Sequence, residues 1–323
     1  MRDLPKIELH LHLEGAAPPA FIRGLAQEKR IDISGIFTED GGYAYRDFNH
    51  FLEVYEAACS VLTGPEEFAR LTRAVLEESA SHGIVYSEVF LSPDFCGGSD
   101  ITLWREYLAA IEEAAQALPE VTLRGIITCI RHFGPEQAKK TAACAADTAG
   151  DFITGFGMGG AEDVGAPGDY AWAFDCAREA GLQITTHAGE WGGAKSVRDS
   201  IDALNPVRIG HGVQAIDDPS LCDLIAERGI TLEVCPGSNV FLGAYPSLDK
   251  HPIERLRERG VKVTVSTDDP PFFRTTMTQE YENLARTFGY DEAVFAELNQ
   301  TALDAAFCDA ATKEMIQKRL KTP

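Results

Sequence analysis

The chain has 323 residues, 45% of them hydrophobic and 24% charged, which is the composition of an ordinary globular protein and argues against general disorder. Its 29 Lys and Arg face 50 Asp and Glu, so the formal net charge is −21, and this excess of acid disfavours binding to nucleic acid or to an anionic membrane surface. No apolar stretch reaches the roughly 18–20 residues of a membrane span, and no signal peptide is evident at the N-terminus.

In chain order, short apolar segments alternate with amphipathic ones. Eight segments are apolar, rich in β-branched residues and short enough to be buried parallel strands. They are Ile7–His12, Gly83–Leu91, Leu123–Arg131, Ile153–Gly157, Gln183–His187, Arg208–His211, Thr231–Cys235 and Lys262–Thr267. Helical spacing is clear at Leu103–Leu118, Leu221–Arg228 and Pro252–Arg259, and a helix-terminating glycine follows each of the last two.

This alternation predicts an α/β protein, a (β/α)8 TIM barrel, with a doubly wound sheet as the alternative. The barrel is favoured because polar, metal-capable residues follow at least five different strands, and only a closed barrel brings so many strand ends around one point. The connection between residues 13 and 82 is too long for one crossover helix. We therefore expect extra helices after strand one and at the C-terminus, within a single domain over residues 1–323.

Eight cysteines include no C-x-x-C pair, and most lie in apolar runs. This pattern predicts reduced thiols in a cytoplasmic protein.

Polar residues at three strand ends predict a metal site. His10 and His12 stand at i and i+2 of one strand and therefore share a face. His187 ends another strand, and Asp268 with Asp269 ends the last. Each motif alone is more often a satisfied strand-end residue or a solvated loop. Three histidines and one carboxylate at one barrel end, however, make a plausible first shell with room for a water.

The same residues stand in five ordered motifs: PKIELHLHLEG at 5–15, HAGE at 187–190, RIGHG at 208–212, CPGSN at 235–239 and STDDP at 266–270. In residue type and order these motifs resemble those of the adenosine and adenine deaminases, within the metal-dependent amidohydrolases. The resemblance extends over nearly the whole chain and is highly specific.

The resemblance implies one Zn2+ per chain, held by His10, His12, His187 and Asp268. It further implies that Glu190 protonates purine N1, that His211 orients and deprotonates the attacking water, and that Asp269 hydrogen-bonds N7. The backbone N–H of Gly160 is expected to meet N3, and Glu14 to contact the ribose. His12 is expected to contact substrate as well as metal. The catalytic set is therefore Glu190, His211 and Asp269.

The implied reaction is hydrolytic deamination of adenosine and deoxyadenosine to inosine and deoxyinosine with release of ammonia, as part of purine metabolism. The alternative substrate is another 6-aminopurine, either adenine or aminodeoxyfutalosine. Gly210 favours the nucleoside, since adenine-specific relatives typically carry Asp there. A non-catalytic barrel is the third hypothesis, and the presence of every ligand and of Glu190 argues against it.

The expected partner is a small-molecule purine nucleoside, with no nucleic acid and no membrane; a homo-oligomer is compatible with the sequence. Gly237, Ala161 and Arg274 depart from the family's usual pattern and leave substrate detail open. The aromatic segment from Tyr43 to Phe48 is expected to close over the sugar as a lid or to pack in the core.

Overall fold

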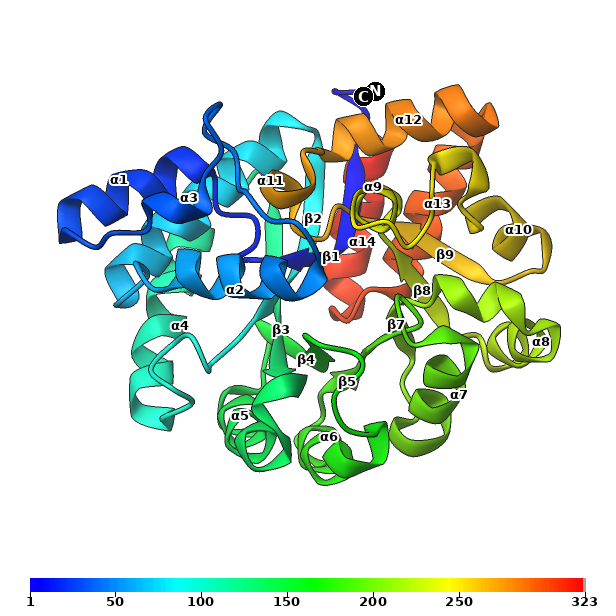
Figure 1. Cartoon of the computed structure of the whole chain (residues 1–323). Helices are drawn as coiled ribbons and strands as arrows, with labels where there is room; N and C mark the ends of the chain where they lie inside the picture. The colour runs from blue at the N-terminus through cyan, green and yellow to red at the C-terminus, as the bar shows by residue number, and fades with distance from the viewer. Residues whose placement is uncertain (322–323) are drawn as a thin grey trace.

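The computed structural model describes residues 1–321 and shows a parallel barrel surrounded by helices (Figure 1). One run of paired strands has the order β1 (Lys6–His12), β2 (Ile84–Leu91), β3 (Thr122–Ile130), β4 (Ile153–Gly159) and β5 (Gln183–Ile184). The other has the order β6 (His187–Ala188), β7 (Arg208–His211), β8 (Thr231–Val234) and β9 (Lys262–Val265). All of these pairings are parallel, and the predicted TIM barrel is confirmed.

The predicted strand Gln183–His187 is divided in the structure into two short strands, β5 and β6. The residues between them still bond to both neighbours: the N–H of Thr185 donates to the carbonyl of Phe156 at 3.0 Å, and that of Gly210 donates to the carbonyl of Thr186 at 2.9 Å. The two pieces therefore fill one strand position, which passes from pairing with β4 to pairing with β7.

The ring closes between β1 and the end of β9. The N–H of His12 donates to the carbonyl of Asp268 at 3.1 Å, and the N–H of Asp268 donates to the carbonyl of His10 at 3.2 Å. Asp268 has a left-handed backbone with φ of +70°, a conformation that costs energy for a non-glycine residue and often marks functional sites. The residues whose backbones close the barrel are therefore the same residues that carry the polar side chains His10, His12 and Asp268.

Helices cover the outside of the barrel because each has one apolar face at helical spacing. They are α3 (Pro65–Ser81), α4 (Ile101–Gln116), α5 (Pro135–Thr148), α6 (Ala171–Glu179), α7 (Gly193–Leu204), α8 (Pro219–Arg228), α10 (Ile253–Glu258) and α13 (Glu292–Ala305). The Asp100 and Asp218 side chains cap α4 and α8 by accepting from backbone N–H groups. Gly229, with φ of +66°, ends α8 as the sequence predicted.

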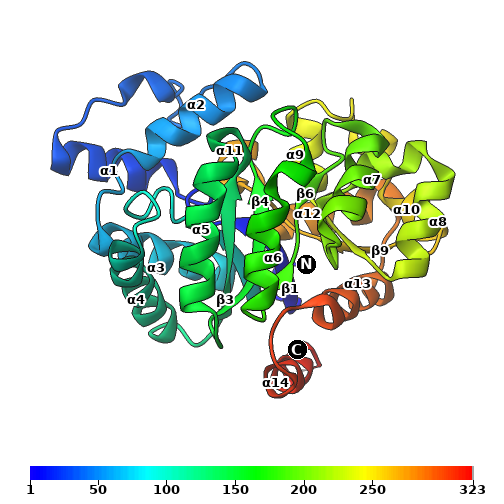
Figure 2. The ribbon, with the colours of Figure 1, turned by 90° about the horizontal axis from the view of Figure 1, so that it is seen from below.

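The long connection after β1 holds the expected extra helices, α1 (Pro19–Lys29), the 3-10 turn η1 (Ser34–Ile36) and α2 (Phe48–Cys59). Figure 2 shows α1 and α2 standing out beyond the rim of the barrel on one side. Short helices α9 (Pro236–Phe241) and α11 (Pro270–Phe273) follow β8 and β9 at the same rim, and α12 (Met277–Phe288) comes next. Helix α2 is thus in a position to border a pocket at the carboxyl ends of the strands.

The C-terminal segment closes the opposite end of the barrel. The chain between α13 and α14 (Ala310–Leu320) places the Phe307 ring 3.5 Å from the guanidinium carbon of Arg208, and the N–H of Phe307 donates to Glu88. All eight cysteines are free thiols. Within residues 1–321 no helix is both long enough and apolar enough to cross a bilayer.

Candidate active site

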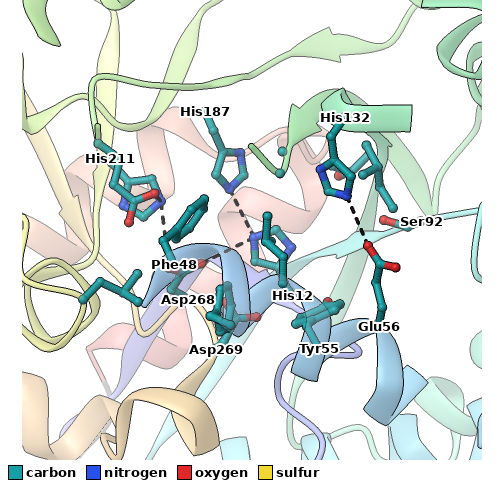
Figure 3. Close-up of a pocket in the computed structure, with 18 of the residues that line it drawn as sticks. His12, Phe48, Tyr55, Glu56, Ser92, His132, His187, His211, Asp268 and Asp269 are labelled. Carbon is teal, nitrogen blue, oxygen red and sulfur yellow. Dashed lines mark hydrogen bonds and ion pairs between the residues drawn. The ribbon is translucent and has the colours of Figure 1, made fainter. Parts of the chain in front are cut away.

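A pocket lies at the carboxyl ends of the strands, where TIM-barrel sites are normally found (Figure 3). Its walls come from the strand ends, from the loops that follow them and from α2. The lining residues are His12, Phe48, Phe51, Leu52, Tyr55, Glu56, Ser92, Phe95, Thr128, Ile130, His132, Gly159, Gly160, His187, Glu190, His211, Leu242, Asp268, Asp269 and Phe273.

The four predicted metal ligands gather at one end of this pocket. Their ligand atoms all lie within 4.8 Å of one another. Nε2 of His12 is 3.1 Å from Nε2 of His187, and Oδ1 of Asp268 lies 3.3 Å from Nε2 of His10 and 3.4 Å from Nε2 of His12. Three ring nitrogens and one carboxylate oxygen therefore converge on a common point.

Contacts on the outer ring nitrogens of His187 and His10 direct their Nε2 atoms toward this common point. Nδ1 of His187 donates to the carbonyl of Met158 at 2.8 Å, and Nδ1 of His10 lies 2.8 Å from Oε2 of Glu233. Nε2 of His10 is buried and has no hydrogen-bond partner. Burial lowers the pKa of His12 and of His187, so both rings are neutral at pH 7, the form that can bind a metal ion. The donor set fits a divalent ion such as zinc.

Behind the ligands lies a buried ion-pair network that sequence reasoning missed. Arg208 bonds Glu233 at 2.6 Å through Nε and Glu88 at 2.7 Å through Nη1, and all three side chains are at most 1% exposed. Thr185 also donates to Glu233 at 3.0 Å. The carboxylate that orients His10 is therefore itself fixed by a guanidinium, an arrangement that tunes metal ligands in many proteins. The available signal was a charged residue, Glu233, inside the apolar run of β8.

The three predicted catalytic residues lie beside the four predicted metal ligands. Oε2 of Glu190 lies 3.6 Å from Nε2 of His211, and the amide of Asn239 lies 3.2 Å from Nδ1 of the same ring. Oε1 of Glu190 and Oδ1 of Asp269 are buried without a hydrogen-bond partner. Both residues line the pocket, so each has an unpaired carboxyl oxygen at or behind its wall.

Burial sets the protonation of this group. It raises the pKa of Glu190 well above its usual range, with the carboxylates of Asp268 and Glu162 adding to the shift. It lowers the pKa of His211 to about 4. At pH 7 Glu190 can therefore hold a proton to donate, and the His211 ring is neutral.

A further carboxylate, Glu162, holds the loop that carries Glu190. Its oxygens accept from four backbone N–H groups, those of residues 189, 190, 191 and 192, at distances between 2.5 and 3.2 Å. These bonds keep the pKa of Glu162 low although burial opposes it. Sequence reasoning missed Glu162, because no local signal connects it with a loop 27 residues away.

The structure also places the predicted substrate contacts. Gly160 lines the pocket with φ of +93°, and the neighbouring N–H of Ala161 donates to Nδ1 of His132 at 3.3 Å. Glu14 is buried, with burial raising its pKa to about 7, and it is not among the residues that line the pocket. Its contact with a ribose stays a prediction.

Gly210 does not line the pocket. A Cβ on this residue would lie 2.7 Å from Cε1 of His10, one of the predicted metal ligands. A side chain at Gly210 would therefore collide with the His10 ring and would not occupy space in the pocket. The expectation that Gly210 favours a nucleoside thus has no basis in the structure.

The other departures from the family pattern have local causes. A Cβ on Gly237 would overlap Oε1 of the buried Glu280, whose Oε2 accepts from the Gly237 N–H at 3.0 Å. Arg274 is half-exposed, lies 4.0 Å from Asp40 and does not line the pocket. Of the aromatic segment, Tyr43 packs in the core, stacked on Phe272, and Phe48 lines the pocket.

The sequence model of the adenosine deaminase family matches residues 5–323 of this chain. An adenine deaminase of Rhizobium leguminosarum bv. trifolii is 46% identical over 98% of this chain and 99% of its own, and one of Agrobacterium fabrum is 45% identical over 98% of each. The solved structure of an adenine deaminase from Arthrobacter aurescens superposes with a TM-score of 0.87 at 27% identity, covering 98% of both chains. An amidohydrolase from Burkholderia ambifaria with bound zinc gives 0.85 at 26% identity, covering 99% of this chain and 93% of its own.

Gly210→Ala is expected to weaken metal binding about 10- to 100-fold, because the new methyl group displaces the His10 ring from its place against Glu233. Metal affinity can be measured by competition with a chromophoric chelator. Gly24→Ala is the matched control, since a Cβ there meets nothing within 4 Å. Equal affinity in the two variants would contradict the assignment of His10 as a ligand.

Glu162→Gln is expected to loosen residues 189–192, because an amide offers one acceptor oxygen where the carboxylate offers two. Hydrogen exchange at these four amides should accelerate at least about tenfold, with the metal retained. The exposed neighbour provides the control, Asp163→Asn, which should leave exchange unchanged. Unaltered protection in the Glu162 variant would show that the loop is held by other contacts.

Proposed function

The chain belongs to the adenosine deaminase family and is a hydrolytic deaminase, and we propose that its substrate is the free base adenine, converted to hypoxanthine and ammonia. The observation that carries this proposal is the 42–46% identity, over nearly full length, to eight proteins that are all named adenine deaminase. The expectation of adenosine as the main substrate gives way to its alternative, since the Gly210 argument behind it does not hold.

The proposed cofactor is one zinc ion held by His10, His12, His187 and Asp268. When bound, zinc acts as a Lewis acid and brings the pKa of water from about 15.7 to near 7. The zinc-containing relative and the convergence of these four side chains support this assignment. The cytoplasmic location and a homo-oligomeric state stay predictions.

The chain's own residues supply the proton transfers. We propose that His211 orients the attacking water: Nδ1 of the neutral ring faces the amide of Asn239, so the ring proton sits on Nε2, which lies 3.9 Å from Asp268 and 3.6 Å from Glu190. Glu190, with its raised pKa, is placed to donate a proton to N1 of the purine as the water adds to C6. That proton matters because addition breaks the aromaticity of the ring and leaves negative charge on N1. General acid catalysis of this kind contributes about 10²–10⁴-fold.

The same pocket offers hydrogen bonds to the rest of the base. Asp269, with one oxygen unpaired, is proposed to bond N7, and the backbone N–H of Gly160 is proposed to donate to N3. A site built on such bonds rejects analogues that lack the matching group more strongly than an apolar pocket does.

The proposal is tested by following ammonia release and purine absorbance with adenine, adenosine, deoxyadenosine and AMP. Adenine should be the best substrate. Wild-type protein that prefers adenosine, or that turns over none of the four, would overturn the proposal.

Glu190→Gln should lower turnover of adenine at least about 10²-fold with the metal retained, because an amide cannot deliver the proton to N1. Glu179→Gln, an exposed change on α6, is the control and should keep full activity. Near-normal turnover in the Glu190 variant would remove this residue from the mechanism.

A further inference from the structure

The pocket has a second polar end, opposite the metal ligands. Figure 3 shows His211, His187, His12 and Asp268 gathered on one side and Glu56, His132 and Ser92 on the other. Oε1 of Glu56 lies 3.2 Å from Nε2 of His132. Glu56 comes from α2, and His132 comes from the 3-10 turn η2 (Arg131–Phe133) that follows β3. None of the chemistry described so far uses this pair.

The hydrogen bonds of His132 determine which of its ring nitrogens donates to Glu56. Nδ1 accepts from the N–H of Ala161 at 3.3 Å, so in a neutral ring the proton sits on Nε2 and is donated to Oε1 of Glu56. Oε2 of Glu56 makes no hydrogen bond to any other part of residues 1–321 that the structure reveals. One carboxyl oxygen is therefore held and the other is left as an acceptor at the pocket wall.

The shape of the substrate determines which of its edges meets this end. Adenine is flat and rigid, and its reacting carbon, C6, must lie at the metal end. N3 lies across the six-membered ring from C6, and N9 lies next to that edge on the five-membered ring. If C6 points toward His12 and His187 and N3 meets the N–H of Gly160, the N3–N9 edge is directed toward His132, which packs against Gly160, and toward Glu56 beyond it. Free adenine in water carries a proton on N9, whereas a nucleoside carries the sugar there.

On the premise of the proposed function, we propose that Glu56 is a specificity-determining residue: it accepts a hydrogen bond from N9–H of the free base, with His132 holding it in place. A nucleoside has no N9–H to offer and directs its sugar at the same carboxyl group and at Tyr55, one residue before it on α2. Free bases are selected both by the bond that they make and by the obstruction that a sugar meets.

The alternative role for Glu56 is to fasten α2 to the barrel through His132 without touching substrate. The two roles differ in what they predict for 9-methyladenine, which has the ring of adenine but no N9–H. A residue that only positions α2 affects adenine and 9-methyladenine alike. A residue that accepts from N9–H affects adenine alone.

The experiment compares kcat/KM for adenine, 9-methyladenine and adenosine in the wild-type protein, Glu56→Ala and Glu53→Ala. Glu53 lies on the same helix, is exposed and does not line the pocket, so its variant is the matched control. The side chain of Glu56 is 46% exposed, so its removal is not expected to disturb folding, and thermal unfolding checks this.

Glu56→Ala should lower kcat/KM for adenine about 10- to 100-fold and leave that for 9-methyladenine within about twofold, so the ratio of the two falls. The adenine-to-adenosine ratio should fall as well. Glu56→Gln keeps an acceptor oxygen and should restore part of the adenine rate, whereas Glu53→Ala should match the wild type.

The outcomes separate this inference from the proposed function. If the wild-type protein prefers adenine but Glu56→Ala leaves the adenine-to-9-methyladenine ratio unchanged, the inference is wrong and the proposed function stands. An equal loss on both substrates would likewise overturn it and assign Glu56 to the placement of α2. A wild-type preference for adenosine would overturn the proposed function, and the inference with it.

Discussion

The ion pairs of Arg208 inside the barrel are the interaction on which the metal end depends. Its guanidinium bonds Glu88 and Glu233 at 2.7 and 2.6 Å, and all three side chains are nearly inaccessible to solvent. Burial would raise the pKa of Glu233, but Arg208 and His10 hold it below its usual value. The ionised Glu233 then takes the outer nitrogen of His10 and leaves the inner one for a cation. Removing any one of the three side chains would leave a buried charge without its partner, which would destabilise the fold.

The pocket itself carries more carboxyl groups than positively charged side chains. Four of its lining residues, Glu56, Glu190, Asp268 and Asp269, carry carboxyl groups, and no lysine or arginine lines it within the described chain. A divalent cation bound by His10, His12, His187 and Asp268 would offset this excess at one end, and proton uptake by Glu190 relieves it nearby. A phosphate group would find no counter-charge there. The electrostatics therefore suit an uncharged purine better than a nucleotide.

The sequence predicted the site residues that lie at the carboxyl ends of strands. It did not predict the residues whose role depends on where their side chains point in the folded barrel. The convergence of His10, His12, His187 and Asp268 was predictable because parallel strands bring their carboxyl ends to one rim, which brings distant motifs together. Glu233 and Glu162 were missed because their partners lie far along the chain and neither sits in a recognisable pattern. Gly210 was misread because only the closed barrel shows that its Cβ direction leads to His10 and not to the substrate.

Reaction class and substrate choice therefore reside in different parts of the molecule. The metal end is built on strands whose register and closure fix it rigidly, so any member with this barrel and these ligands can share the chemistry. The far end is built on α2, which the long insertion after β1 carries over the rim. In the segment just before α2, the hydroxyl of Tyr45 donates to the carbonyl of Phe272 on α11 at 2.7 Å. A helix in such an insertion can change without disturbing barrel closure. The proposed discrimination between a free base and its nucleoside is accordingly to be sought in α2, because Glu56, which we propose accepts from N9–H, lies on that helix.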